Sequence, residues 1–363
     1  MRHYMFIMRT FALLPYTKKG KTMRFQLLSL VSMYTCIVYF YFGFTIIKNF
    51  LENVLILMTK NEDITLRDFL DKFMGLPLKL CIFIIPLFWI DMYGIINYWH
   101  QWDSFQGKYE SCTGKELTFQ NATTRIRLLI TIPIMLISLN IFLVCKRMHW
   151  KCKPISALNY IYIYVAISLI TGYYHANSYM FQVTARDINQ RILKVLVKSK
   201  SSTITFRDHV ELWCHLSQLI KDFGNAHSSI YCSTALIMYI ACAMSVFMFL
   251  VCFLVAVDKS SNMLYPILFT NAIVLMFCEG AYMILKEMGS DLQWKILNIN
   301  VSGLNESMKH EVQDFIEIIQ LSRTSMNFGG FCEINRNLYG KFILGIAFNV
   351  VILIQFQLIP TSS

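Results

Sequence analysis

Charged residues are scarce in this chain. Only 15% of its 363 residues are charged, while 56% are hydrophobic. Water-soluble domains have about 25% charged and about 45 to 50% apolar residues, and they need that polar surface to cover a core. The shortage of charge therefore excludes an ordinary soluble globule and favours a fold embedded in lipid.

Sequence signatures of enzymes and metal sites are also missing. The chain contains no GxSxG, HExxH or GxGxxG motif. Its eleven cysteines form no CxxC pair, and the neighbours His209, Cys214 and His215 are followed by no second pair of ligands. We therefore expect no enzymatic activity, no metal site and no cofactor.

Acidic residues are outnumbered by basic ones, which gives a net charge of +11. No Lys/Arg-rich helix or RNA-binding signature accompanies this excess, so we expect no nucleic-acid partner. Loops that face an anionic cytoplasmic leaflet explain it better. The loops on alternate sides of the predicted spans contain 21 and 9 Lys/Arg residues, which predicts a cytoplasmic N-terminus and an extracellular C-terminus. The basic loop 146–153 disagrees with this orientation.

Long hydrophobic runs are what the sequence does contain. A membrane-spanning helix needs about 20 mostly apolar residues, and continuous runs of this length exclude the short alternating strands of a β-barrel. We read no cleaved signal peptide in residues 1–24 and no linker or repeat, which predicts one all-α domain over 1–363. Seven spans are predicted, at 25–47, 76–98, 126–145, 155–183, 228–253, 263–285 and 342–358.

The two longest connections between spans have helical patterns. Apolar residues recur every three or four positions in 206–223 and again in 311–321. Both segments fall on the predicted cytoplasmic side. They predict a cytoplasmic layer of helices beneath the membrane.

Two acidic residues, Asp91 and Glu279, lie inside predicted spans. A charge within a bilayer is costly, so it lines a cavity or pairs with a partner. For these two, pairing with a basic residue or a helix terminus and a functional role both stay open.

Polar and aromatic side chains gather in the outer halves of the spans, where a small ligand from outside would arrive. For each of them, ordinary helix packing is the alternative to ligand contact. The candidate ligand-binding residues are Asn140, Asn159, Tyr160, Tyr164, Phe269 and Asn271, with Tyr265 beside them.

The last span has an amide among apolar residues. Steps of four, three and four place Phe348, Ile352, Gln355 and Ile359 on one stripe of a helix. An amide ring beside a hydrophobic ring could narrow and gate a symmetric pore.

This C-terminal region resembles the insect gustatory receptor family, from Gly329-Gly330-Phe331 to the run Val350–Phe356. The seventh span of that family carries Thr-Tyr, five hydrophobic residues and then Gln-Phe. Here the five hydrophobic residues and Gln355-Phe356 are present, but Phe348-Asn349 replaces Thr-Tyr. The length of the chain, its seven spans and its long last cytoplasmic loop are similar to the family as well.

The resemblance implies a ligand-gated cation channel in the plasma membrane of a sensory neuron dendrite. A small tastant would open it and drive acceptance or avoidance. Four subunits, identical or different, would surround a pore lined by their seventh helices, with Ile352, Gln355 and Phe356 at the pore and gate. The family's ligand pocket lies among the outer halves of the second to sixth spans. The replacement of Thr-Tyr by Phe348-Asn349 affects the expected packing of subunits around the last span more than it affects the pore.

A G-protein-coupled receptor of seven helices is the main alternative. Against it, the third span ends in Cys145-Lys146-Arg147 without an acidic-Arg-aromatic motif, and the seventh has no Asn-Pro-x-x-Tyr. A transporter would have related halves with matching broken helices, which the sequence does not contain.

Overall fold

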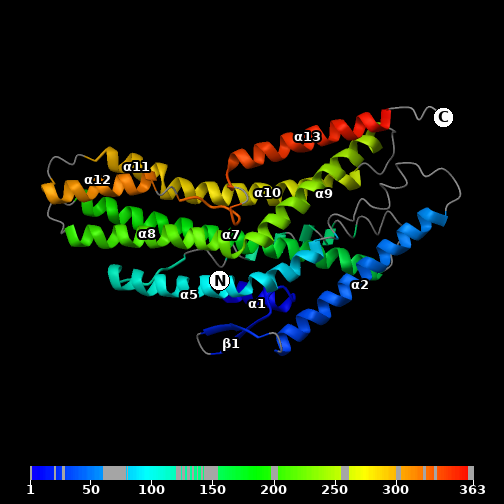
Figure 1. Cartoon of the computed structure of the whole chain (residues 1–363), viewed down its shortest axis with the longest axis horizontal. Coiled ribbons are helices and arrows are strands. Elements are labelled where there is room, and N and C mark those ends of the chain that lie inside the picture. Colours follow the sequence, from blue (N-terminus) through cyan, green and yellow to red (C-terminus); the bar gives the residue numbers. More distant parts are fainter. Residues whose placement is uncertain are drawn as a thin grey trace.

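A computed structural model describes most of the chain. It covers 2–19, 22–26, 29–59, 79, 81–119, 154–197, 203–254, 261–299, 304–321, 324–330 and 333–358, with isolated residues between 124 and 142. These residues form an elongated bundle of helices (Figure 1). Within the described part, the two strands β1 (Tyr16–Lys19) and β2 (Thr22–Phe25) pair as one antiparallel hairpin.

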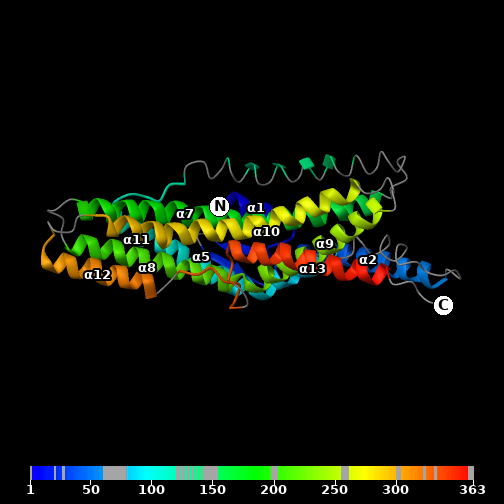
Figure 2. The same ribbon diagram turned by 90° about the horizontal axis from the view of Figure 1, so that it is seen from above.

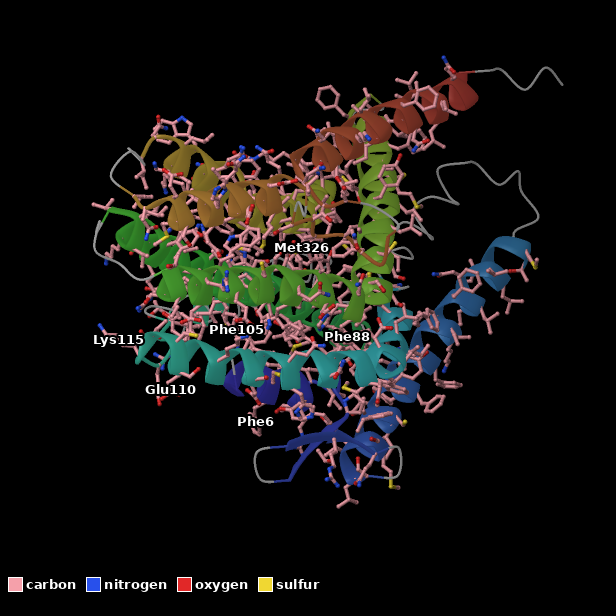
Figure 3. All side chains as sticks on the ribbon, turned by 60° about the vertical axis from the view of Figure 1, so that its left-hand side comes forward. Phe6, Phe88, Phe105, Glu110, Lys115 and Met326 are labelled. Atoms are coloured by element: carbon pink, nitrogen blue, oxygen red, sulfur yellow. The ribbon has the colours of Figure 1, made fainter. Side chains whose placement is uncertain are left out.

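The N-terminal helix α1 (Arg2–Thr10) packs into the side of the bundle. Tyr4, Met5 and Met8 are buried on one face, whereas Phe6 points outward and is 63% exposed (Figure 3). The Tyr4 hydroxyl donates a hydrogen bond to the Leu169 carbonyl, at 2.5 Å. The first residues of the chain therefore contact the middle of the fourth predicted span.

The first two predicted spans are real helices with shifted boundaries. Phe25 belongs to β2, so α2 begins at Leu30 and runs to Thr59. It continues past the predicted end because Lys48 and Glu52 lie one turn apart, with their charged atoms at 4.0 Å, a spacing that stabilises a helix. The second span is formed by the 3-10 turn η1 (Cys81–Ile84) and α5 (Ile85–Thr113).

Helix α5 extends fifteen residues beyond its predicted end because its apolar face continues. Trp99, Trp102 and Phe105 are buried. The helix stops at Gly114, which takes the left-handed conformation (φ 66°) and donates its N–H to the Glu110 carbonyl at 2.8 Å. Glycine adopts this conformation without strain.

The last four predicted spans lie in four long helices, α7 (Pro154–Val197), α9 (Ser228–Leu254), α10 (Ser261–Met288) and α13 (Arg336–Leu358). Helices of the described residues that are long and apolar enough to cross a membrane lie in Leu30–Ile56, Cys81–Thr113, Ser228–Val251, Leu264–Leu297 and Arg336–Gln355. The fourth predicted span is helical within α7. Of the third, the isolated described residues, such as Leu128 and Ile132, are helical, and the rest lies outside the described residues.

Three helices form a base at one end of the bundle, together with the last turns of α5 and α7 (Figures 1 and 2). They are α8 (Thr203–Ala226), α11 (Ser290–Leu297) and α12 (Glu306–Leu321). Trp213 of α8 and Phe315 of α12 pack edge to face with ring centroids 5.4 Å apart. The predicted helical layer is therefore present, and its cytoplasmic side stays a prediction.

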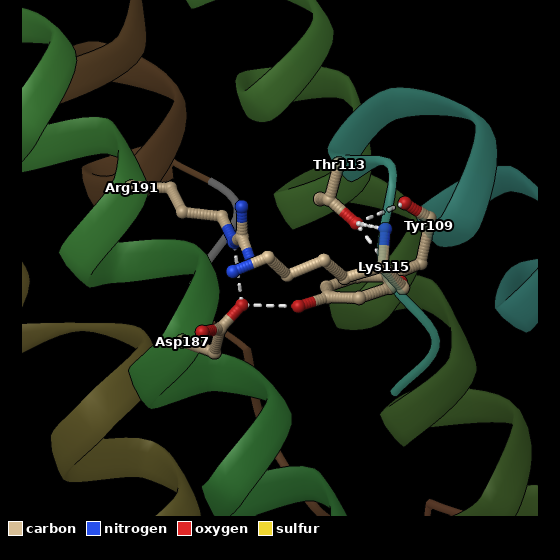
Figure 4. Close-up of polar contacts among 5 residues, drawn as sticks. All are labelled: Tyr109, Thr113, Lys115, Asp187 and Arg191. Carbon is tan, nitrogen blue, oxygen red and sulfur yellow. Dashed lines mark hydrogen bonds and ion pairs between the residues drawn. The ribbon is translucent and has the colours of Figure 1, made fainter. Parts of the chain in front are cut away.

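Ionic and polar contacts hold the base together. Tyr109 of α5 donates a hydrogen bond to Asp187 of α7, and the Arg191 guanidinium donates to the same carboxylate oxygen at 2.6 Å (Figure 4). Lys108 of α5 pairs with Glu211 of α8. The contacts of Tyr109 and Lys108 join helices that are far apart in the sequence. The Tyr109 contact holds α7 in place where that helix leaves the apolar part of the bundle.

Gly224 of α8 gives a test of the close packing between the base and the chain before α13. A Cβ atom added there would meet the backbone carbonyl of Asn327. We expect Gly224→Ala to lower the free energy of unfolding by about 1–3 kcal/mol, because overpacking outweighs the gain in helix propensity. Thermal unfolding in detergent measures this change.

The matched control is Gly107→Ala in α5, where an added Cβ meets no atom within 4 Å. It should leave the melting temperature unchanged or raise it. Equal effects of the two substitutions would mean that Gly224 tolerates a side chain.

Candidate functional site

The face of α10 that meets α7 carries a regular set of side chains. Tyr265, Phe269, Ala272 and Met276 follow one another at steps of four, three and four residues, so they lie on one side of the helix. The two helices run parallel, because Tyr164 contacts Tyr265 near their starts and the Tyr174 hydroxyl donates to the Phe277 carbonyl at 2.9 Å further along.

A cavity of about 640 Å³ lies against this face, which is within the usual range for small-ligand sites. One wall comes from α7, one from α10 and one from described residues of the third predicted span. Among the described residues of the walls, most side chains are apolar and none is an Asp, Glu, Lys or Arg. The lining residues are Leu128, Ile132, Leu136, Ser168, Thr171, Gly172, His175, Tyr265, Leu268, Phe269, Ala272, Ile273 and Met276.

Two hydroxyl groups in the cavity walls lack a partner. The oxygens of Ser168 on α7 and Tyr265 on α10 are buried and have no hydrogen-bond partner among the described residues. The Thr171 hydroxyl, by contrast, donates to the Ile167 carbonyl of its own helix at 2.9 Å. A buried hydroxyl without a hydrogen-bond partner destabilises the protein, and a bound molecule that supplies the missing hydrogen bond removes this cost.

Tyr164, Phe269 and Tyr160, three of the predicted ligand-binding residues, lie on the same faces as the cavity. The ring centroid of Tyr164 is 4.8 Å from that of Phe269 and 5.4 Å from that of Tyr265, so these rings cluster at one end of the cavity. Phe269 itself lines it. Tyr160 is one turn before Tyr164, with Lys79 Nζ 5.3 Å from its ring centroid.

Two of the three predicted asparagines, Asn159 and Asn271, lie away from this cavity. Asn159 lies on another face of α7, where it accepts a hydrogen bond from Thr45 of α2 at 3.3 Å. Asn271 lies on another face of α10 and donates to Cys242 Sγ of α9 at 3.1 Å and to the Ile267 carbonyl at 2.8 Å. Asn140 lies outside the described residues. An amide in an apolar helix needs a partner, and for Asn159 and Asn271 a neighbouring helix supplies it.

Sequence reasoning missed the α7 wall of the cavity. Ser168, Thr171, Gly172 and His175 follow Tyr164 on the same helical face. Their periodicity was a usable signal, because Tyr160 and Tyr164 already marked that face.

The predicted pore residues lie on α13, which is the least buried of the candidate membrane-spanning helices among the described residues. Phe342, Ile346 and Val350 are buried against the bundle, whereas Gln355 is exposed and Ile352 is half-buried at the edge of the exposed face. Phe356 lies in α13, but its side chain is outside the described part. The exposed stripe, named the α13 stripe below, consists of Leu344, Phe348, Val351 and Gln355.

Both acidic residues of the spans have structural partners. Glu279 of α10 receives two hydrogen bonds from the guanidinium of Arg336, at 2.8 and 2.9 Å, at the first residue of α13. The Arg336 Cζ atom also lies 3.6 Å from the ring centroid of Tyr282. Asp91 accepts a hydrogen bond from Ser229, the second residue of α9, at 3.2 Å.

Glu279 also continues the cavity-lining face of α10. It follows Met276 by three residues and so extends the series from Tyr265 by one more step. One continuous helix therefore carries both the cavity wall and, further along, the contact with α13.

No group of three His, Cys, Asp or Glu side chains that could hold a metal ion occurs among the described residues. His209 instead makes a hydrogen-bond contact with the Thr205 carbonyl one turn earlier, at 2.6 Å. The features that the described structure offers for function are a cavity, a connecting helix and an exposed amide stripe.

Comparison with known proteins gives matches along the whole chain. Residues 1–359 match a family described as 7tm chemosensory receptor. Gustatory and odorant receptor 24 of Anopheles gambiae is 22% identical over 360 residues, which cover 97% of this chain and 76% of that protein. Gustatory and odorant receptor 21a of Drosophila melanogaster is 21% identical over 265 residues, which cover 71% of this chain and 57% of that receptor.

Solved structures match as well. The insect olfactory receptor OR5 from Machilis hrabei superimposes with a TM-score of 0.66 at 12% identity, over 98% of this chain and 97% of that one. The same receptor in complex with eugenol gives a TM-score of 0.63 at 13% identity, with the same shares covered. Together with the family description, this likeness confirms the predicted all-α fold of seven membrane helices.

Proposed function

Because the chain belongs to the 7tm chemosensory receptor family, we propose that it is a subunit of a ligand-gated cation channel. In this proposal a small tastant binds in the α7–α10 cavity, with Tyr160, Tyr164 and Phe269 at its edge or wall. Four α13 helices from identical or related subunits line the pore, with Ile352, Gln355 and Phe356 at the gate. The receptor acts in the plasma membrane of a sensory neuron dendrite and drives acceptance or avoidance.

The observation that carries the proposal is the path along α10. Its cavity-lining residues run from Tyr265 to Met276, and the next step on the same face, Glu279, holds Arg336 at the start of α13. A ligand that shifts α10 would therefore move the helix that we assign to the pore. The membership of a chemosensory receptor family supports this reading over a G-protein-coupled receptor.

The α13 stripe supports an assembly of several subunits. Leu344, Phe348 and Val351 are 72%, 66% and 52% exposed in a single chain, and the amide of Gln355 ends the same stripe. A stripe that combines apolar residues with an amide suits a helix that meets its own copies around an axis. Bilayer lipid alone would favour a stripe without the amide.

The test is ligand-evoked current in cells in which G-protein signalling is blocked, with the subunit expressed alone and with candidate partner subunits. We expect the current to persist, because the channel itself conducts, and we expect Gln355→Ala and Ile352→Ala to change permeation or gating. Gln320→Ala, at an exposed amide of α12, is the control and should have no effect. Loss of current under the block would favour the G-protein-coupled receptor, and unchanged currents in both α13 variants would refute the pore assignment.

The predicted orientation needs a separate test. Because Tyr4, Met5 and Met8 are buried, an epitope is better inserted in the turn between Lys19 and Thr22 than fused to Met1. We expect the epitope to be labelled only after cells are permeabilised. Labelling on intact cells would contradict the cytoplasmic N-terminus.

A further inference from the structure

The walls of the α7–α10 cavity limit the chemistry of what can bind there. Four of its lining residues carry polar side chains, Ser168, Thr171, His175 and Tyr265, and the rest are apolar. The Thr171 hydroxyl already donates its proton within α7. A ligand in this cavity would therefore find few groups to replace the water that it loses on binding.

We propose that the ligand is a neutral, mostly apolar molecule with one carbonyl, hydroxyl or ether oxygen, and that this oxygen binds the hydroxyls of Ser168 and Tyr265. This inference rests on the proposed function, because it names the ligand class of the same cavity. It separates the ligand from strongly hydrated tastants such as a sugar or an amino acid.

A sugar fits these walls poorly because every one of its hydroxyls needs a partner once it is buried. An amino acid fits worse, since its carboxylate and ammonium groups would be buried beside described walls that contain no Asp, Glu, Lys or Arg. An apolar molecule instead gains free energy from contact with Leu268, Phe269 and Met276. The apolar walls thus favour hydrophobic ligands over strongly hydrated ones.

The two unpartnered hydroxyls point to one polar group on the ligand. Ser168 is only 9% exposed, and the oxygens of Ser168 and Tyr265 are both buried without a partner among the described residues. They come from facing helices, and each hydroxyl can donate or accept a hydrogen bond. A ligand oxygen that accepts a hydrogen bond from each hydroxyl would give both of them a partner. It would also link α7 and α10 through the ligand.

Direct binding to the purified full-length protein in detergent tests this ligand class. Protection against thermal unfolding would be measured with acetophenone, with ethylbenzene as its analogue that lacks the carbonyl, and with sucrose and alanine. We expect acetophenone to bind more tightly than ethylbenzene, and sucrose and alanine to give no protection that depends on the cavity.

Two conservative variants locate the hydrogen bonds. Tyr265→Phe and Ser168→Ala should each weaken acetophenone binding about fivefold, as expected for the loss of one hydrogen bond, while ethylbenzene binding stays the same. The controls Tyr93→Phe and Ser111→Ala remove exposed hydroxyls of α5 and should change neither. Because these substitutions remove only an oxygen, they are expected to leave the fold intact.

Three results would overturn the inference. They are failure of acetophenone to bind at its solubility limit, binding that neither variant weakens, and binding of sucrose that Ala272→Leu abolishes. The proposed channel function is judged separately by current. Acetophenone binding without current would refute the channel function and leave the proposed ligand class standing. Sugar-evoked current that Ala272→Leu removes would refute the ligand class and leave the channel function standing.

Discussion

Replacing Arg336 by alanine is expected to raise the ligand concentration for half-maximal current by at least about tenfold. Arg336 makes two hydrogen bonds to Glu279, which lies on the cavity-lining face of α10 about 21 Å along the helix from Tyr265. Without Arg336, the first turn of α13 loses its hydrogen bonds to Glu279 and its contact with the Tyr282 ring of α10, so movement of α10 is transmitted to it less directly. Coupling between sites typically changes affinity by about 5–150-fold, and the expected shift is within that range.

Folding should be affected much less than gating by this change. The side chains of Arg336 and Glu279 are 54% and 38% exposed, and ion pairs at such positions contribute little to stability. Arg336→Lys should have an intermediate effect, because lysine keeps the charge but cannot form the two parallel hydrogen bonds.

The matched control for Arg336 is Arg207→Ala. Arg207 of α8 pairs with Glu311 of α12 in the base, away from the path between cavity and α13, and its loss should leave the current unchanged. Cell-surface labelling would check that each variant reaches the membrane. Equal shifts in both variants, or none in Arg336→Ala at normal surface expression, would contradict coupling through Glu279.

Acidification is expected to destabilise the protein strongly through His227. This residue, between α8 and α9, is fully buried, and burial lowers the pKa of its imidazole to about 4. Its ring lies among Tyr98, Tyr173 and Phe223, and its Nε2 is 3.2 Å from the Tyr173 hydroxyl. These neighbours therefore accommodate the neutral imidazole. None of them is a carboxylate that could pair with a protonated ring.

The direction of the pH effect follows from the pKa of His227 in the folded and the unfolded chain. In the unfolded chain a histidine has a pKa of about 6.5. Between about pH 6.5 and pH 4 the unfolded state therefore binds a proton at this histidine, whereas the folded state does not. Stability is thus complete above about pH 6.5 and falls as the pH drops toward 4. A difference of this size corresponds to about 3 kcal/mol at the acidic end.

Thermal unfolding from neutral pH to about pH 4 measures this loss. His227→Gln, which does not titrate, should remove most of the histidine-dependent part of the acid destabilisation. His100→Gln is the control, because His100 of α5 is exposed. If wild type and His227→Gln lose stability in parallel, His227 is not the group responsible.

The comparison of prediction and structure shows which residues carried a local signal. The helices of the base were predictable because Trp213, Leu216 and Ile220 repeat at helical spacing and are buried as a set. The end of α2 was not, since Lys48 looks like a membrane boundary in the sequence although the helix continues to Thr59. Helix α5 also continues past its predicted end, and there Trp99 and Trp102 are buried, so helix length depends on tertiary packing as well as on the local apolar run.

The candidate site was predictable only in part, for a related reason. Tyr164 and Phe269 were identified from residue type and span position, and the structure puts their rings in contact. Asn159 and Asn271 have the same polarity and similar depth, but they face α2 and α9. Residue type fixes the need for a partner, whereas the rotation of each helix decides which partner it meets.

The sequence by itself determined that this chain is a membrane protein of helices, because transfer of apolar runs into lipid depends on local composition and length. It also identified the last span as unusual, through Gln355 in an apolar stripe. Only the tertiary structure decided that α1 packs against α7, that Ser168 and Tyr265 line one cavity, and that Glu279 holds Arg336. These contacts join segments far apart in the chain, and their free energy depends on packing geometry that no local pattern contains.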